Sequence, residues 1–186
     1  MKKIMFNDKY GLTKAVLEGR KTMTRRIVPD GTPLGNCDET VKMSHYKVGD
    51  VVAVAQPYKD CVNEILVNWG HKTDITVMVF QKMVGWANKM FVQADLMPHQ
   101  IRITGVQVER LQDITDEDCL KEGVSQSNIP GQCFVDGLQR PHHNDGVLNA
   151  FWSPRDAFAA LIDKVSGKGT WASNPWVFVY EFELVK

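Results

Sequence analysis

Basic side chains crowd into one short stretch near the start of the chain. Five cations fall within 13 positions, with one acidic residue among them: Lys14, Arg20, Lys21, Arg25 and Arg26. A cluster of this density can form a local phosphate-binding patch, because Lys and Arg contacts to phosphate oxygens dominate the affinity for nucleic acids. The alternative is a solvated helix end followed by a strand edge, which is the ordinary origin of a charge cluster.

Two aromatic residues offer a second possible contact with nucleic acid. Trp86 and Phe91, flanked by Lys82 and Lys89, could stack on bases as aromatic side chains do in proteins that bind single strands. Core packing is the favoured interpretation, because most aromatic side chains of a folded protein are buried.

A metal site is not expected. His142, His143 and Cys133 are the residues that would suggest one, but they lack the spacing of metal ligands. Adjacent histidines also point in different directions in most backbones. We therefore expect no metal and no other cofactor.

The composition limits the class of protein. The chain has 22 basic and 22 acidic side chains, so it has no global basic field and any anion site must be local. The four cysteines are widely separated and no signal peptide is recognised, which favours the reduced cytoplasm. No apolar run approaches the roughly 20 residues that span a bilayer, so a membrane role is not expected. The length suits one domain over residues 1–186.

Periodicity predicts the elements that position the basic cluster. Residues 12–18 have helical spacing and end at Gly19, and helices are also predicted after the capping residues Thr115 and Ser153. Strands are predicted over residues 4–6, 22–28, 51–55, 101–110 and 176–184, the third of them central and the fourth with a bulge at Gly105. The fold class is therefore mixed and strand-dominated (α+β), a β-barrel with about three helices.

Two stretches interrupt this pattern. Residues 56–100 hold two further strand candidates, at 64–67 and 74–80, and look like an elaboration of a smaller barrel. Residues 125–150 are rich in Ser, Asn, Gly, Pro and His and lack periodicity, which is uncommon unless the segment serves a site or is mobile.

The run from Gly19 to Arg26 resembles the signature G-x-K-x-x-T-x-R of the ASCH family, with Arg26 in the final place. Residues 48–50 before an apolar strand, the strand-to-helix join at 109–115 and the strand ending at 179–182 agree with it in order. The resemblance covers roughly residues 1–28, 46–55, 100–123 and 150–186, in the style of the longer, phage-associated members. It implies a PUA-like β-barrel that handles RNA or modified nucleosides.

The resemblance also implies a catalytic set. Small bacterial relatives are acetylcytidine amidohydrolases whose Lys and Thr match Lys21 and Thr24, and the helix register places their Glu on Glu122. These residue types could supply a proton shuttle, a nucleophile and a positive group near the developing oxyanion. The base for Thr24 would be either Glu122 or Lys21 with a pKa lowered by desolvation. Lys21 must precede the strand proper, because positions 21 and 24 lie on opposite faces of a regular strand.

The resulting hypothesis is a domain that binds RNA or a modified nucleoside in a pocket between the barrel and the first helix. Lys21, Thr24 and Glu122 would floor the pocket, and the phosphate contacts would come from Arg20, Arg25, Arg26 and Lys14. The activity would be amide hydrolysis on an acylated nucleoside. Two alternatives stay open, because the insertions at 56–100 and 125–150 could cover the cleft. They are a non-catalytic module that binds RNA or a nucleotide, and a scaffold or interaction protein of phage or mobile-element origin.

Overall fold

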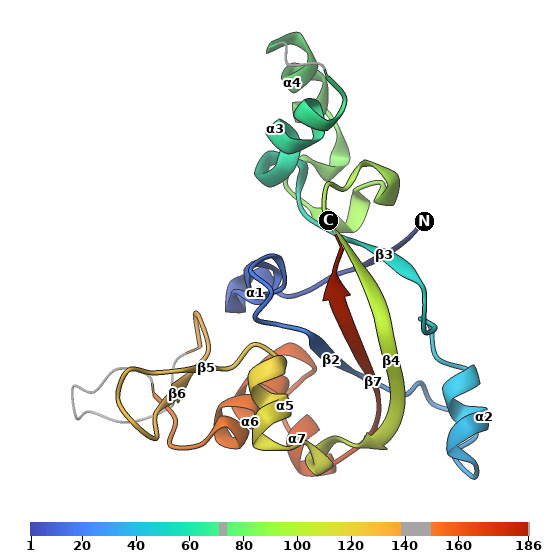
Figure 1. The fold of residues 1–186 in the computed structure, drawn as a ribbon, viewed down its shortest axis with the longest axis vertical. Helices are drawn as coiled ribbons and strands as arrows, with labels where there is room; N and C mark the ends of the chain where they lie inside the picture. Colours follow the sequence, from blue (N-terminus) through green and yellow to red (C-terminus); the bar gives the residue numbers. More distant parts are fainter. Residues whose placement is uncertain (71–73, 139–149, 186) are drawn as a thin grey trace.

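A five-stranded sheet forms the centre of the molecule (Figure 1). The computed structural model describes residues 1–70, 74–138 and 150–185. The strand order is β1-β3-β4-β7-β2, with β1 parallel to β3 and the other neighbouring pairs antiparallel. The strands are β1 (Lys2–Ile4), β2 (Met23–Ile27), β3 (Val51–Val54), β4 (Gln100–Arg110) and β7 (Trp176–Leu184).

The two long strands β4 and β7 pair in the middle of the sheet, so β4, and not β3 as predicted, is the central strand. The predicted bulge is confirmed, because the register of the pair shifts between Ile103 and Gly105. Phe178 and Val179 lie on opposite faces of β7 and are both buried. β7 is therefore covered on both sides, whereas period two alone predicts one apolar face.

The predicted barrel is not closed. β1 and β2 are the outer strands of the sheet, and within the described residues they are not hydrogen-bonded to each other. Instead the Arg26 side chain of β2 donates a hydrogen bond from Nη2 to the carbonyl of Met5, just after β1, at 2.6 Å. β1 is only three residues long, because the chain leaves the sheet where Asn7 caps the 3-10 helix η1 (Asp8–Tyr10). A sheet edge this short cannot pair along the whole of β2.

The described residues form seven α-helices, more than the predicted three. The predicted helices are confirmed as α1, α5 and α6, and the hydroxyls of Thr115 and Ser153 cap the latter two as expected. The helices are α1 (Leu12–Leu17), α2 (Cys37–Lys42), α3 (Tyr58–Asn68), α4 (Asp74–Gln81), α5 (Asp116–Lys121), α6 (Pro154–Val165) and α7 (Thr170–Ser173). In Figure 1, α5, α6 and α7 gather at one end of the sheet.

The insertion at 56–100 is helical, and the two strands predicted there are wrong. Figure 1 shows α3 and α4 standing away from the sheet, followed by the short 3-10 helices η2 (Val84–Trp86), η3 (Lys89–Phe91) and η4 (Ala94–Leu96). Tyr58, Cys61, Ile65 and Leu66 recur at helical spacing, and they pack with Phe80 in a second apolar cluster. A short run rich in apolar residues fits a strand as well as a helix. Only the helical spacing over the longer segment distinguishes a helix from a strand here.

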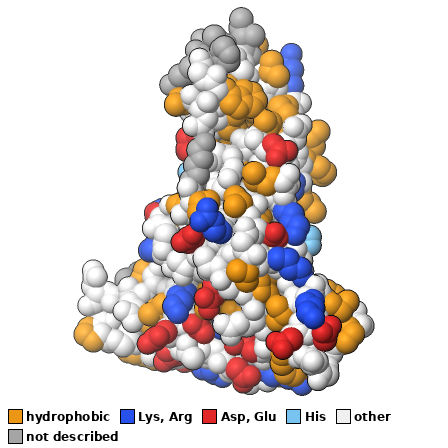
Figure 2. Space-filling view, turned by 45° about the vertical axis from the view of Figure 1, so that its right-hand side comes forward, with side chains coloured by type: hydrophobic (Ala, Val, Ile, Leu, Met, Phe, Trp, Pro, Cys, Tyr) orange, Lys and Arg blue, Asp and Glu red, His pale blue; other side chains and the backbone are white. Residues whose placement is uncertain are grey.

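Several large apolar side chains are exposed on the surface of the insertion. Figure 2 shows hydrophobic side chains gathered on the upper part of the molecule, where the insertion lies, whereas charged side chains of both signs are frequent on the lower part. The large apolar side chains exposed on the insertion are Val67, Trp69, Met78, Val79, Val84, Met90 and Phe91. The core-packing interpretation therefore holds for Trp86, which packs on the second cluster, and is wrong for Phe91, which is 58% exposed.

Residues 125–138 and residue 150 of the second insertion are described. It contains a small hairpin of β5 (Ser125–Gln126) and β6 (Cys133–Phe134), so this part is not structureless as expected. Cys133 also bridges to Phe151, which ties the hairpin to the chain just before α6. Residues 139–149, including His142 and His143, lie outside the described residues.

All four cysteines are free, and only Cys37 is exposed. Burial raises the pKa of the Cys61 and Cys119 thiols to about 12, and it also raises that of Cys133. Because the thiolate is the reactive form, we expect Ellman's reagent to label one thiol rapidly in the native protein and all four in denaturant. Cys37→Ser should remove the rapid phase. A second native thiol reacting at the same rate would contradict this prediction.

Candidate functional site

The turn after α1 places Lys21 ahead of β2, as predicted. Gly19 adopts φ +72°, a left-handed conformation that costs glycine little, and the amides of Arg20 and Lys21 both donate to the carbonyl of Ala15 at 2.9 Å. β2 begins only at Met23. The long Lys21 side chain can therefore turn back into the protein instead of following the alternation of the strand.

The ammonium of Lys21 is buried and fully hydrogen-bonded. Its side chain is 2% exposed, and Nζ donates to the carbonyls of Met23 at 2.8 Å and Glu122 at 2.6 Å. The third donor reaches the carboxylate of Glu122, at 2.6 Å from Oε2. An ammonium has three N–H donors, so every proton of Lys21 has an acceptor within the protein. The Phe6 ring lies 5.8 Å from Nζ and covers the charge on another side.

Burial lowers the pKa of Lys21, because desolvation disfavours the ammonium more than the nearby Glu122 favours it; Arg26 and Arg25 add a smaller lowering. Between this lowered pKa and the ordinary value of 10.5 the unfolded chain binds more protons at this position than the folded chain. The contribution of Lys21 to stability is therefore complete above that ordinary value and is lost as the pH falls through the lowered pKa.

This titration predicts a pH dependence that can be measured without knowing the function. We expect the free energy of unfolding to rise with pH across that window more steeply in the native sequence than in Lys21→Met. Urea denaturation of both proteins at a series of alkaline pH values measures the difference. Identical slopes would show that Lys21 does not titrate in this window in the folded protein.

Glu122 lies between two cations. It is the C-terminal capping residue of α5 and is 4% exposed, with Oε2 on Lys21 and Oε1 3.3 Å from Nη1 of Arg25. A carboxylate this deeply buried requires such compensation, because an unpaired buried charge is costly. Lys21 and Glu122 are 101 positions apart in the sequence, so only the fold brings them together.

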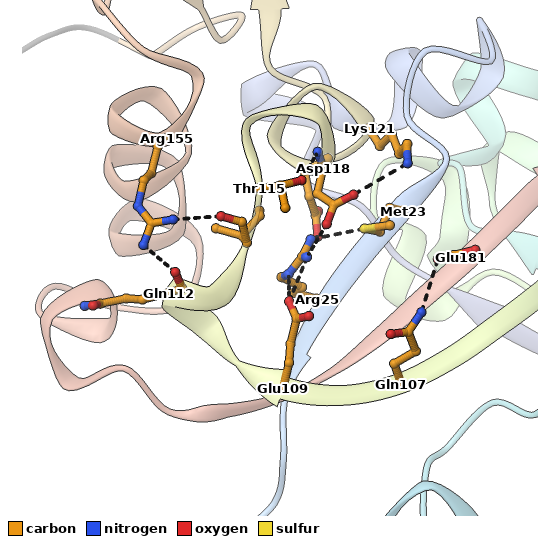
Figure 3. A network of polar contacts seen from close by, with 12 residues as sticks. Met23, Arg25, Gln107, Glu109, Gln112, Thr115, Asp118, Lys121, Arg155 and Glu181 are labelled. Carbon is orange, nitrogen blue, oxygen red and sulfur yellow. Dashed lines mark hydrogen bonds and ion pairs between the residues drawn. The ribbon is translucent and has the colours of Figure 1, made fainter. Parts of the chain in front are cut away.

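Arg25 pairs with three carboxylates, of which Figure 3 labels those of Glu109 and Asp118. Its side chain is 1% exposed, and Nη2 lies 2.7 Å from Glu109 Oε1 and 3.1 Å from Asp118 Oδ2, in addition to the contact with Glu122. Nε also donates to Glu109, and Nη1 contacts the sulfur of Met23. The guanidinium is therefore fully engaged inside the protein and is not available to a phosphate.

Thr24 lies beside these groups with its hydroxyl open. The side chain is 5% exposed and makes no hydrogen bond to another described residue. Among the described residues no fully buried side-chain nitrogen or oxygen lacks a partner, so the hydroxyl must keep contact with solvent. Thr24 lines a cavity that Lys21 and Glu122 also line, and we call it the first cavity.

The first cavity has a volume of about 280 Å³. The predicted position between the barrel and the first helix is met by one residue of α1, Leu12. Four lining residues come from α6, which the sequence did not assign to the site: Phe158, Leu161, Ile162 and Val165. Met5 and Phe6 line it as well. The volume is near the lower limit of the roughly 300–1,000 Å³ found for ligand sites and suits a single ring system with a small substituent. Apolar walls around a few polar groups are typical of such sites.

The other predicted phosphate contacts lie in different settings. Arg20 and Lys14 are exposed and share the carboxylate of Glu18, at 2.7 Å and 3.7 Å, outside the first cavity. Arg26 lines the cavity and has no carboxylate within salt-bridge distance in the part of the chain that is described. Of the four predicted residues, Arg26 is thus the one whose charge is both near the cavity and uncompensated.

Within residues 1–70, 74–138 and 150–185, no group of three or more His, Cys, Asp or Glu side chains could hold a metal ion. The prediction about His142 and His143 lies outside the described residues. No described helix is both long and apolar enough to cross a membrane.

No family model, curated protein or solved structure matches the chain. What the first cavity binds is therefore inferred from the side chains that line it.

Proposed function

We propose that the first cavity binds a modified pyrimidine nucleoside and hydrolyses its N-acyl amide, as in the acetylcytidine amidohydrolases of the ASCH family. The observation that carries the proposal is the convergence of Lys21, Thr24 and Glu122 on one small cavity, with Lys21 and Glu122 in contact at 2.6 Å. Membership of the ASCH family is part of the same proposal. It rests on the signature at 19–26 and on this convergence.

The chemistry follows from the protonation states. Burial lowers the pKa of Lys21, which favours the neutral amine over the ammonium. The amine then accepts the proton of the Thr24 hydroxyl as Oγ1 bonds to the acyl carbon. When the C–N bond breaks, the exocyclic nitrogen of the base takes a proton from Lys21. Water then cleaves the threonyl ester and releases the carboxylic acid, which restores the hydroxyl.

A binding module without turnover is the second candidate, and one observation favours it. All three protons of Lys21 are already used within the protein, so the ammonium has no free donor for an oxyanion unless it moves. If the ammonium does not move, Thr24 and the Glu122 carboxylate would bind a base by hydrogen bonds without hydrolysing it.

Incubation of the protein with a panel of acylated nucleosides, followed by chromatography, separates the two candidates. Catalysis predicts that acetylcytidine is converted to cytidine and acetate in equal amounts. A binding module predicts that the nucleoside is retained by the protein, in equilibrium dialysis, without conversion. Absence of both conversion and retention would reject the proposed function.

A further inference from the structure

A second cavity lies against the first and shares a wall with it. Its volume is about 440 Å³, and Met5, Arg26 and Ile27 line both cavities. The two therefore adjoin at the open edge of the sheet, where the Arg26 side chain reaches across from β2 to the carbonyl of Met5. Two neighbouring cavities with Met5, Arg26 and Ile27 as their shared wall therefore lie where the barrel is not closed.

The second cavity has an aromatic floor and an accessible rim. Tyr46 and Tyr180 lie edge to face in the floor, with ring centroids 5.2 Å apart, and Phe178 lies beside them. Burial raises the pKa of both phenols, so they stay neutral. His45 and Met43 are exposed at the rim, with the His45 ring 4.6 Å from that of Tyr46. A flat heteroaromatic ring would find an apolar floor and a ring to stack on.

The charges around the second cavity are positive. Lys3 and Arg26 line it, no Asp or Glu does, and neither cation has a carboxylate within salt-bridge distance among the described residues. Arg26 spends one N–H on the Met5 carbonyl, and a guanidinium has five in all. Its remaining donors have no acceptor among the described residues, and because Arg26 lines both cavities a phosphate there could pair with them as a fork. The preceding residue, Arg25, differs from Arg26 because its guanidinium is already paired with three carboxylates.

We propose that the second cavity holds the neighbouring nucleotide of a single-stranded RNA, with the linking phosphodiester on Arg26. This inference rests on the proposed function, and it specifies the substrate as a modified base within a strand instead of a free nucleoside. A free nucleoside would place its base in the first cavity, but it has no phosphate for the uncompensated Arg26 and leaves the aromatic cavity unused. Single-stranded RNA is recognised by this combination of stacking surfaces and arginine contacts to the backbone.

The test compares acetylcytidine with a trinucleotide that carries acetylcytidine in the middle, so that either neighbour can enter the second cavity. We expect kcat/KM for the trinucleotide to exceed that for the nucleoside by about tenfold or more, the effect of one stacked base. Near-equal values for the two substrates would overturn the inference while leaving the proposed function intact.

Variants at the rim locate the effect. His45→Ala removes the stacking ring, and Met43→Glu adds a negative charge beside the expected phosphate path; both should lower kcat/KM for the trinucleotide to near the nucleoside value. Neither should change the value for the nucleoside. Met43→Gln is the matched uncharged control and should behave like the native protein. A loss that is equal for both substrates would show that the rim acts on the first cavity only.

Binding of unmodified RNA keeps the inference testable if no acylated substrate is hydrolysed. Fluorescence polarisation with a labelled trinucleotide of cytidine and uridine should show weaker binding to His45→Ala and Met43→Glu than to the native protein and Met43→Gln. Affinity should also fall as salt rises. Equal binding by all four proteins would reject the second cavity as an RNA site, whatever the fate of the proposed activity.

Discussion

Replacing Arg25 by methionine is expected to lower the free energy of unfolding by about 3–5 kcal/mol, the cost of removing one partner from a buried ion pair. The substitution keeps most of the apolar volume but leaves Glu109, Asp118 and Glu122 without their shared cation. Glu122 keeps Lys21, whereas Glu109 and Asp118 are about one quarter exposed and recover some hydration. The midpoint of urea denaturation measures the loss.

Two further variants test the cause of this loss. Arg20→Met removes an exposed cation that pairs with Glu18 and should change stability by less than about 0.5 kcal/mol. Adding Glu109→Gln and Asp118→Asn to Arg25→Met should restore part of the lost free energy of unfolding. The two substitutions remove carboxylates that repel each other once the Arg25 cation is absent. If Arg25→Met unfolds at the same midpoint as the native protein, the network in Figure 3 does not stabilise the fold.

Lys21→Met is expected to reduce the hydrolysis of acetylcytidine by about 10³-fold or more, if the first cavity is catalytic as we propose. The variant loses both the proton shuttle and the positive charge, and proton transfer alone contributes about 10²–10⁴-fold in enzymes. Comparison of kcat/KM with that of the native protein measures the effect. Lys14→Met, which removes an exposed cation seven positions earlier, is the matched control and should retain full activity.

A stability measurement separates the loss of chemistry from loss of the fold. Lys21→Met leaves the buried Glu122 paired with Arg25 alone, so some destabilisation is expected, and the assay must be run where circular dichroism shows the variant folded. Glu122→Gln keeps the shape of the side chain and should also lose activity, because the ammonium that Lys21 forms on accepting the Thr24 proton loses its carboxylate partner. Retention of activity by either folded variant would exclude the mechanism.

The sequence was sufficient where local signals decide the structure. The hydroxyl caps at Thr115 and Ser153, the helical spacing of the residues that follow and the alternation in β7 depend on neighbours within a few positions. The placement of Lys21 before β2 follows from the same local geometry. These elements are seen where they were expected.

The insertion shows where local signals mislead. The segments that become α3 and α4 contain short β-branched and apolar runs that fit a strand, and their helical state depends on packing around Tyr58, Leu66 and Phe80. Closure of the barrel could not be predicted from the sequence either, because it depends on how closely β1 and β2 approach from opposite edges of the sheet. The order of the strands in the sheet, and not the residue pattern within each strand, sets the distance between β1 and β2.

By itself the sequence determined four of the five strands of the sheet, the three predicted helices and the presence of a basic cluster around the signature at 19–26. The first strand, predicted at residues 4–6, lies instead at Lys2–Ile4. The tertiary structure alone decided which of those cations are available to a ligand. Arg25 and Arg26 are adjacent in β2 and both line the first cavity, yet Arg25 is paired with three carboxylates, whereas Arg26 has none within salt-bridge distance among the described residues and also lines the second cavity. The physical reason is that successive side chains of a strand point to opposite faces, and the partners on each face come from residues distant in the sequence.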